Sequence, residues 1–120
     1  MDESFPKHAR VRKQSEFDAV YQASVYAADN LLVVQVQRNG LNVTRLGLSV
    51  GKKVGDAPTR NKWKRNIREV FRKCRHRPPV GLDLVVRPKK GAVLNYANLE
   101  RAFPRLVSRV AKKLPPQDCS

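Results

Sequence analysis

An amphipathic helix constrains the fold of this chain more than any other feature. Between residues 55 and 77, apolar side chains recur at i, i+4, i+7, i+8 and i+11, which is one face of an α-helix: Trp63, Ile67, Val70, Phe71 and Cys74. An amide and five cations share an arc of similar width on the far side: Asn61, Lys64, Arg65, Arg68, Arg72 and Arg75. The helix therefore needs a core on one side and carries an unexplained charge on the other.

Local residues mark the ends of this helix. Asp56 is expected to cap it, and Pro58 falls in its first turn, where a missing N–H does no harm. Pro78 and Pro79 end it. Within it, Glu69 precedes Lys73 by four residues, the spacing of a favourable surface pair.

The net charge of the chain indicates a polyanionic partner. Its 120 residues suffice for one domain, and 25 Lys and Arg against 10 Asp and Glu give a net charge of +15. That exceeds the roughly 2 to 8 charges that suffice for the solubility of a small domain. Nucleic acid is the first candidate, because binding phosphates releases counterions, and an anionic membrane is the second. The membrane is disfavoured because the longest apolar run, residues 31–34, is far too short to span one.

Targeting signals and metal-ligand patterns are both lacking in the sequence. No hydrophobic signal region precedes Ser15, so the cytoplasm is the expected compartment. Residues 1–120 are expected to form one domain, with residues 1–9 as a flexible arm and residues 115–120 as a disordered tail. Cys74 and Cys119 have no neighbouring His at metal spacing, so neither a metal site nor a disulfide framework is expected.

The first half of the chain predicts a short helix and a sheet. A helix over residues 16–22, capped by Ser15 with Asp18 in its first turn, is followed by an edge strand at Val25–Ala28. Residues 31–38 alternate, with Leu32, Val34 and Val36 on one face and Val33, Gln35 and Gln37 on the other. Asn39-Gly40 indicates a two-residue hairpin leading to a strand over residues 43–50, which predicts an antiparallel meander.

The second half predicts one more strand and a last helix. Residues 82–87 form the strand, and Asn95 caps the helix. Its buried stripe would be Leu99, Ala102, Phe103, Leu106 and Val110. Because a proline in a helix interior removes one backbone hydrogen bond, Pro104 predicts a kink or a restarted helix.

The sequence offers little for catalysis by the protein itself. Its only histidines are His8 and His76, one in the predicted arm and one at a helix end, and its carboxylates form no evident cluster. Hydrolysis of a phosphodiester usually needs paired carboxylates, histidines or a metal. The protein alone is therefore expected to break no bonds.

Two readings of the charged helix and of the first aromatic residues remain open at this point. A cationic stripe is often only a solvated face, but a solvated face normally mixes signs, and this one holds no acid. Phe17 and Tyr21 are either core residues or a stacking platform beside the basic residues that precede them.

Two motifs resemble the protein subunit of bacterial ribonuclease P. The family has Arg-Asn-Arg-x-x-Lys-Arg-x-x-Arg-Glu or a close variant on a helix after a Lys-Lys loop, and here Arg60-Asn61-Lys62-Trp63-Lys64-Arg65-Asn66-Ile67-Arg68-Glu69 follows Lys52-Lys53. Lys62 stands where the family has Arg, which keeps the charge and loses the planar fork. The segment RVRKQSEFDAVYQ is similar to the family's opening Leu-Arg-Lys-x-x-x-Phe-x-x-Val-aromatic pattern.

The resemblance implies a fold and a division of labour. The fold is α+β, a two-layer sandwich in the order α-β-β-β-α-β-α, whose four-stranded sheet contains a left-handed βαβ crossover. A catalytic RNA hydrolyses the bond at the 5′ end of precursor tRNA and holds most of the Mg²⁺, while the protein binds no cofactor or metal and supplies no catalytic residue. The partners are that RNA and precursor tRNA, with no membrane and no obligate protein partner.

The resemblance also assigns residues to two surfaces. Contacts to the catalytic RNA are Lys52, Lys53, Arg60, Asn61, Lys62, Lys64, Arg65, Arg68 and Arg72. Contacts to the single-stranded 5′ leader are Arg12, Lys13, Phe17, Tyr21, Val33, Gln35 and Gln37. Under this reading Phe17 and Tyr21 stack on unpaired bases. The alternatives are a noncatalytic structural RNA-binding protein, such as a ribosomal component, and a self-sufficient nuclease.

Overall fold

The computed structural model describes residues 10–11, 14–23, 25–41, 43–74 and 81–114, with Tyr21 and Ala23 described by their backbone alone. The predicted arm and tail, Arg12, Lys13, Arg75, both histidines, Cys119 and the pair Pro78-Pro79 lie outside these residues. The elements in chain order are α1 (Gln14–Ala23), β1 (Val25–Ala28), β2 (Leu32–Arg38), β3 (Arg45–Leu48), a 3₁₀ turn η2 (Lys52–Val54), α2 (Ala57–Cys74), β4 (Leu82–Pro88) and α3 (Tyr96–Lys113).

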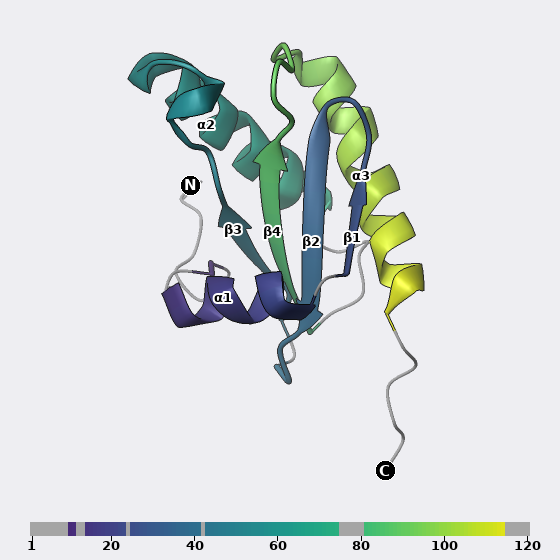
Figure 1. Ribbon diagram of the computed structural model, residues 1–120. Helices are drawn as coiled ribbons and strands as arrows, with labels where there is room; N and C mark the ends of the chain where they lie inside the picture. Colours follow the sequence, from purple (N-terminus) through teal and green to yellow (C-terminus); the bar gives the residue numbers. More distant parts are fainter. Residues whose placement is uncertain (1–9, 12–13, 24, 42, 75–80, 115–120) are drawn as a thin grey trace, which may run out of the picture.

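A mixed sheet separates the helices into two groups. Its four strands lie in the order β1-β2-β4-β3. β1 and β2 are antiparallel, β2 and β4 are antiparallel, and β3 runs parallel to β4. Figure 1 shows α2 and α3 behind the sheet, with α1 crossing its front near one end. The α+β sandwich and its element order agree with the prediction.

The connection from β3 through α2 to β4 has the uncommon hand. With both strands pointing upward in Figure 1, the chain passes behind the sheet as it moves from β3 on the left to β4 on the right. That is a left-handed crossover, whereas about 98% of such connections are right-handed. The resemblance therefore predicted a feature that general packing rules disfavour.

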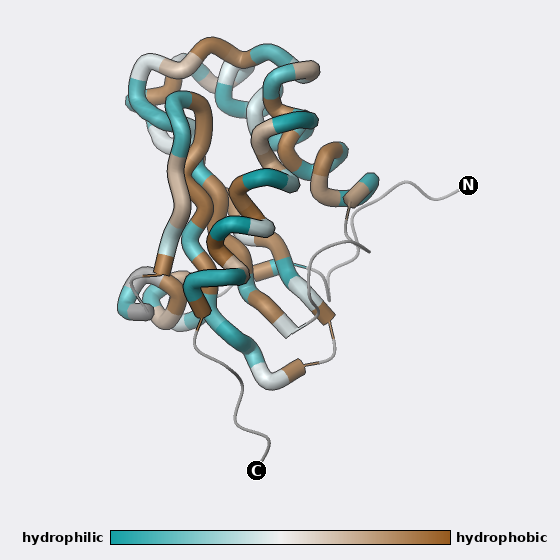
Figure 2. The backbone as a smooth tube through the Cα atoms, turned by 90° about the vertical axis from the view of Figure 1, so that its right-hand side faces the viewer, coloured by the Kyte–Doolittle hydropathy of each residue, from teal (hydrophilic) through white to brown (hydrophobic). Residues whose placement is uncertain are grey.

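The core lies between the sheet and the α2–α3 pair. All five predicted apolar residues of α2 are buried, as are the five predicted in α3 together with Val107. The rings of Phe71 and Phe103 meet edge to face with centroids 6.2 Å apart, a geometry that contributes about 0.5–1.5 kcal/mol beyond burial. Figure 2 shows hydrophobic and hydrophilic residues alternating along these helices, as expected for elements with one buried face.

The predicted meander is wrong beyond β2. The strand after Asn39-Gly40 does not pair with β2, because β4 is inserted between them. Residues 82–86 are buried without interruption, the pattern of a central strand covered on both faces. Asn39 instead shapes a wider loop, since its Oδ1 accepts the Leu41 N–H at 2.8 Å and its Nδ2 donates to the Val43 carbonyl at 3.0 Å.

Two helix details also differ from the prediction. α1 begins at Gln14, so Ser15 lies inside the helix and is not its cap. α3 runs without interruption from Tyr96 to Lys113 with Pro104 inside it, so the helix does not restart there. The cap at its start is as predicted, because Asn95 Oδ1 accepts the Asn98 N–H at 3.0 Å.

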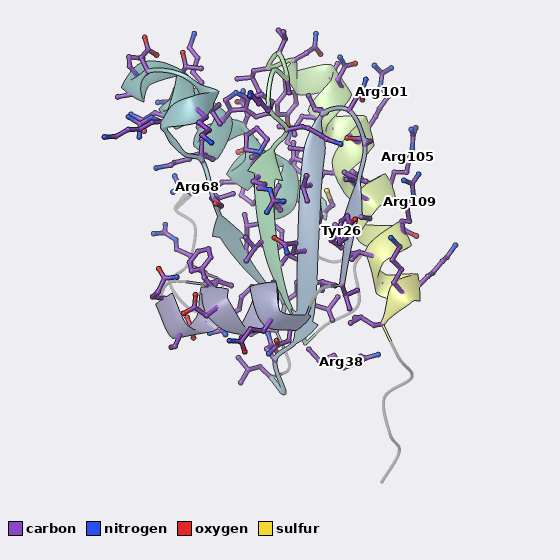
Figure 3. All side chains as sticks on the ribbon, in the orientation of Figure 1. Tyr26, Arg38, Arg68, Arg101, Arg105 and Arg109 are labelled. Atoms are coloured by element: carbon purple, nitrogen blue, oxygen red, sulfur yellow. The ribbon has the colours of Figure 1, made fainter. Side chains whose placement is uncertain are left out.

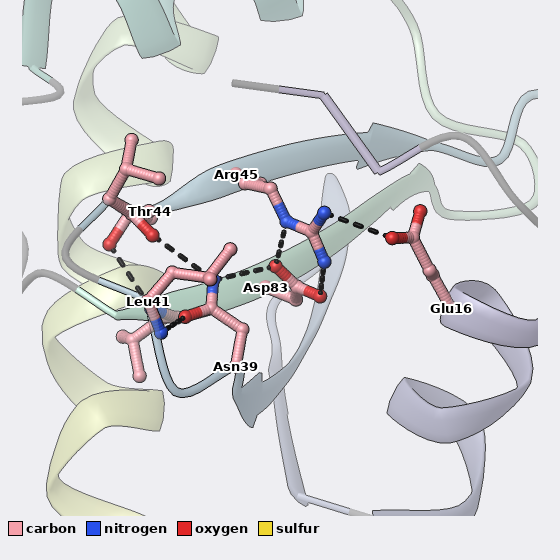
Figure 4. A network of polar contacts seen from close by, with 8 residues as sticks. Glu16, Asn39, Leu41, Thr44, Arg45 and Asp83 are labelled. Atoms are coloured by element: carbon pink, nitrogen blue, oxygen red, sulfur yellow. Dashed lines mark hydrogen bonds and ion pairs between the residues drawn. The ribbon is translucent and has the colours of Figure 1, made fainter. Parts of the chain in front are cut away.

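A polar network fastens α1 to the sheet (Figure 4). Arg45 on β3 donates two parallel hydrogen bonds to Asp83 on β4, from Nε to Oδ1 at 2.8 Å and from Nη2 to Oδ2 at 2.6 Å. Its remaining nitrogen, Nη1, pairs with Glu16 Oε2 of α1 at 2.9 Å. Asn39 Nδ2 donates a further bond to Asp83 Oδ1 at 2.8 Å. The hydrogen bond to Asp83 raises the pKa of the Arg45 guanidinium above its ordinary value, so Arg45 stays charged at any physiological pH.

Candidate nucleic-acid interface

The start of α2 is built from residues that fix the orientation of its cationic face. Asp56 Oδ1 accepts the Thr59 N–H at 3.0 Å, as predicted for the cap. Hydrogen bonding to Thr59 holds the pKa of the Asp56 carboxyl below its ordinary value. Gly55 precedes the cap with φ of 155°, and a Cβ there would lie 2.9 Å from Thr59 Cγ2. The chain therefore enters the helix through a turn that only glycine fits.

The cations of α2 and of the turn before it are largely without acidic partners. Arg65, Arg68, Lys62, Asn61 and both lysines of η2 are exposed, whereas Arg60 and Lys64 are half-buried. Within the described residues, no carboxylate forms an ion pair with any of the cations of this group. The Nε of Arg60 is buried without a hydrogen-bond partner in the same part of the chain. The exposed cations of this group are available to phosphates.

Arg72 is the exception in the predicted RNA-binding set. It forms an ion pair with Glu69, and this hydrogen bond lowers the pKa of the Glu69 carboxyl. The contact ion pair of Glu69 is thus with Arg72 at i+3, which reaches the carboxylate with two nitrogens, whereas the predicted Glu69–Lys73 pair is a weaker electrostatic attraction without a hydrogen bond among the described residues. The ammonium of Lys73 instead lies 5.4 Å from the centroid of the Tyr96 ring on α3. Part of the charge of Arg72 is thus neutralised within the protein.

A hollow of about 290 Å³ brings the two predicted surfaces together. It is lined by Phe17 of α1, by Lys64 and Arg68 of α2, and by Arg10, Val11, Leu46 and Leu48. Burial, and then the nearby charge of Arg10, lower the pKa of the Arg68 guanidinium. Two mutually repelling guanidinium groups and an ammonium around one hollow favour an anion there. Sequence reasoning placed Phe17 and Arg68 on separate surfaces, and the fold joins them.

Gly47 on β3 makes room for the Phe17 ring. A Cβ at this position would lie 2.9 Å from Phe17 Cε1 and 2.9 Å from Val11 Cβ. The backbone N–H of Val11 donates to the Leu46 carbonyl at 2.9 Å, which adds the segment before α1 to the outer edge of β3. Close packing on this glycine therefore sets the position of the ring at the hollow.

The predicted sheet contacts share the face of the sheet that carries α1. Gln35 and Gln37 are half-buried, and Val33 is only 8% exposed, so it offers little surface to a ligand. Arg87 of β4 donates from Nη1 to Gln35 Oε1 at 2.9 Å. Of the other predicted leader contacts, Arg12, Lys13 and the side chain of Tyr21 lie outside the described residues.

Sequence reasoning missed one aromatic residue on this face. Tyr26 pairs in register with Gln35 across β1 and β2, and it is 53% exposed. The signal was present, because an alternating edge strand that buries Ala27 must turn Tyr26 to the other face.

Neither a metal cluster nor a membrane span is present in the described part of the chain. No three His, Cys, Asp or Glu residues gather there in a way that could hold a metal ion. None of its helices combines the length and the apolar character that crossing a bilayer requires.

Comparisons with known proteins agree on one family. The ribonuclease P family profile matches residues 5–111. The chain is 40% identical over 90 residues to the ribonuclease P protein component of Thermotoga petrophila, covering 75% of this chain and 77% of the relative. It is 39% identical over 103 residues to that of Clostridium kluyveri, covering 83% and 92%.

Solved structures give the same result at the level of the fold. The RNase P protein of Staphylococcus aureus superposes with a TM-score of 0.75 at 31% identity, covering 87% of this chain and 95% of the other. That of Thermotoga maritima superposes with a TM-score of 0.77 at 30% identity, covering 83% and 96%.

Proposed function

The chain belongs to the ribonuclease P protein family, and from that premise we propose which of its surfaces meet which RNA. Members of this family are the RNA-binding subunits of a ribonucleoprotein endoribonuclease that matures the 5′ end of tRNA. In this chain, α2 and η2 bind the catalytic RNA. The 5′ leader of precursor tRNA binds at the hollow beside Phe17 and along the neighbouring sheet face that carries Gln35 and Gln37, which together are termed the sheet groove.

The unpaired cations of α2 carry the proposal. With 18 residues the helix is about 27 Å long, enough to follow several phosphates of a structured RNA. Like charges one turn apart destabilise a helix by a few tenths of a kcal/mol per pair, and bound phosphates relieve that repulsion. If about six phosphates are neutralised, the affinity should fall on the order of a thousandfold between 50 and 200 mM salt.

The hollow at Phe17 supports the leader assignment. Unpaired bases stack on aromatic rings at about 1–3 kcal/mol per base, and nearby cations hold the backbone. Phe17 offers the ring, and Lys64 and Arg68 line the same hollow. Gln35 and Gln37, on the sheet face that carries α1, are assigned to the same leader. Arg12, Lys13 and Tyr21 are assigned to it by the sequence motif alone.

The proposed division of labour leaves the chemistry to the RNA. The RNA holds most of the Mg²⁺ and activates the attacking water, and the protein contributes binding and charge neutralisation. The complex acts in the cytoplasm and needs no further protein subunit.

Three substitutions test the two surfaces together. Arg65→Gln removes an exposed cation of α2 away from the hollow and should weaken assembly with the catalytic RNA alone. Phe17→Ala should lower the affinity of the complex for precursor tRNA more than for mature tRNA, and should leave the affinity of the protein for the catalytic RNA unchanged. Arg68→Gln, which borders both surfaces, should weaken both. Affinities for the catalytic RNA, and of the assembled complex for each tRNA, are measured by equilibrium titration.

Lys90→Gln is the matched control, because it removes one exposed cation from the connection between β4 and α3. It should affect neither assay. If Arg65→Gln and Lys90→Gln lower the affinity for the catalytic RNA equally, binding depends on net charge and not on the α2 surface. Equal losses for both tRNAs from Phe17→Ala would remove the leader groove.

A further inference from the structure

The exposed side of α3 carries a second row of cations that the proposed function does not use. Arg101, Arg105 and Arg109 recur every fourth residue, so they follow one line with a rise of about 6 Å per step. Lys112 and Lys113 continue this row, and the five cations together are termed the α3 cationic face. Figure 3 shows the three arginines on the side of the molecule opposite Arg68.

Among the residues that the structure describes, no carboxylate forms an ion pair with this row. The helix contains one carboxylate, Glu100, which projects about 100° of helical rotation from Arg101. Within the described residues, no hydrogen bond or ion pair joins Arg105 or Arg109 to another side chain. Arg101 donates only to the neutral amide oxygen Asn98 Oδ1, at 2.7 Å.

The three arginines of the row do not stabilise α3 through one another. Like charges at i and i+4 cost a few tenths of a kcal/mol per pair. The six buried apolar residues of α3 and its Asn95 cap hold it in place without them. The packing of α3 therefore does not account for the three arginines of the row.

A polar hollow adjoins one end of the row. It has a volume of about 460 Å³ and lies between α3, the β1–β2 turn and residues 91–93, with Asn30, Asn98, Arg101 and Arg105 in its lining. Asp29 also borders it, but its Oδ1 accepts the N–H groups of Leu31 at 2.8 Å and Leu32 at 2.9 Å. The volume is that of a small-ligand site, and its amide and guanidinium groups suit a phosphate or a base edge.

An exposed aromatic ring adjoins the other end. The Lys113 ammonium lies 5.4 Å from the centroid of the Tyr26 ring and donates to the Tyr26 carbonyl oxygen at 2.7 Å. Tyr26 faces the side of the sheet that carries Gln35, its partner in register. Tyr26 thus shares a sheet face with Gln35 and contacts Lys113 of α3 at the β1 edge.

We propose that the α3 cationic face, with Tyr26, binds single-stranded RNA that continues from the sheet groove, namely the upstream part of a long 5′ leader. The inference rests on the leader groove proposed above. A base stacks on Tyr26 beside Lys113, and the arginine row holds the following phosphates. The ligand is single-stranded because an exposed ring at a strand edge can stack only on an unpaired base.

The test compares leader lengths in the assembled complex. Precursor tRNAs with a leader confined to the sheet groove and with a longer leader are titrated against wild type and the double variant Arg105→Gln/Arg109→Gln. We expect the double variant to lose about tenfold in affinity for the long leader at low salt, and its salt slope to fall by about 1.4, two phosphate contacts on a single strand. Its affinity for the short leader and for the catalytic RNA should be unchanged.

Glu100→Gln is the matched control, because it changes the charge of the same helix off the row. It should show no dependence on leader length, and thermal unfolding checks that the double variant is folded. Three results for the double variant would overturn the inference: the same loss of affinity for both leader lengths, no loss of affinity for either, or a loss of affinity for the catalytic RNA alone. Phe17→Ala is measured in parallel. If neither Phe17→Ala nor the double variant lowers the affinity for leader-bearing tRNA, the assignment of the sheet groove to the leader is wrong. If Phe17→Ala lowers that affinity and the double variant does not, only the extension onto α3 is refuted.

Discussion

The buried ion pair between Arg45 and Asp83 gives the sharpest prediction about stability. Arg45→Met removes a side chain that is 16% exposed and leaves Asp83, 7% exposed, with one bond from Asn39. Breaking a buried pair on one side costs about 3–5 kcal/mol. Because Asn39 still donates to the carboxylate, we expect the lower end, about 3 kcal/mol. At about 4 °C per kcal/mol for a domain of this size, the melting temperature should fall by roughly 12 °C.

Two further variants separate the causes of that loss. Glu16→Gln removes only the outer arm of the network, whose side chain is 25% exposed, and should cost less than about 1 kcal/mol. Arg45→Met/Asp83→Leu removes both buried charges and should recover most of the stability. The free energy of unfolding is measured by urea titration, with an unchanged m-value as the check on the denatured state. A cost for Arg45→Met no greater than that for Glu16→Gln would refute the reasoning.

Three other predictions follow from local geometry. Gly47→Ala places a Cβ 2.9 Å from the Phe17 ring; urea unfolding should show a loss of about 1–3 kcal/mol, and titration should show weaker leader discrimination with assembly retained. Asp56, whose pKa is lowered by its bonds to Thr59, stabilises α2 fully above its unfolded pKa, and this contribution disappears as the pH falls through the folded value. In acid titration, the stability of Asp56→Ala should therefore fall less with decreasing pH than that of the wild type. The same dependence of stability on pH in both proteins would contradict this prediction. Asn95→Ala removes the α3 cap and should cost about 1 kcal/mol in urea unfolding; a neutral effect would contradict it.

The helices were predictable because their signals are local. The α2 pattern repeats within a few residues, and its cap and breaker lie next to it in the sequence, so its buried face could be read directly. The Asn95 cap and the buried stripe of α3 followed in the same way. Only the ends shifted, as at Gln14, where the helix starts before the predicted cap.

Strand pairing was not predictable from the same rules. The turn at Asn39-Gly40 indicated that β3 would return along β2, but the uninterrupted burial of β4 places it between them. Local turn chemistry could not reveal a competitor that lies more than forty residues away along the chain. For the same reason the ion pair between Arg45 and Asp83 was not predicted, because it joins neighbouring strands that lie 38 residues apart in the sequence.

The candidate site divides along similar lines. The cations of α2 were identified from a motif on one helix, whereas the hollow that joins Phe17 to Lys64 and Arg68 depends on how three segments pack. The alternation of β1 indicated the face of Tyr26, but its neighbour Gln35 follows only from the register across two strands. Family membership now favours the ribonuclease P subunit over the ribosomal alternative, and the assignment of each residue remains a prediction.

Cleavage of precursor tRNA by the reconstituted complex tests the central claim most directly. A bacterial ribonuclease P RNA is assayed at a Mg²⁺ concentration at which it cleaves poorly alone, with and without this protein. The protein should restore cleavage at the mature 5′ end, Arg65→Gln should require a higher protein concentration for the same rate, and protein without RNA should cleave nothing. A protein that leaves the RNA's activity unchanged, or that cleaves precursor tRNA without the RNA, would contradict the account.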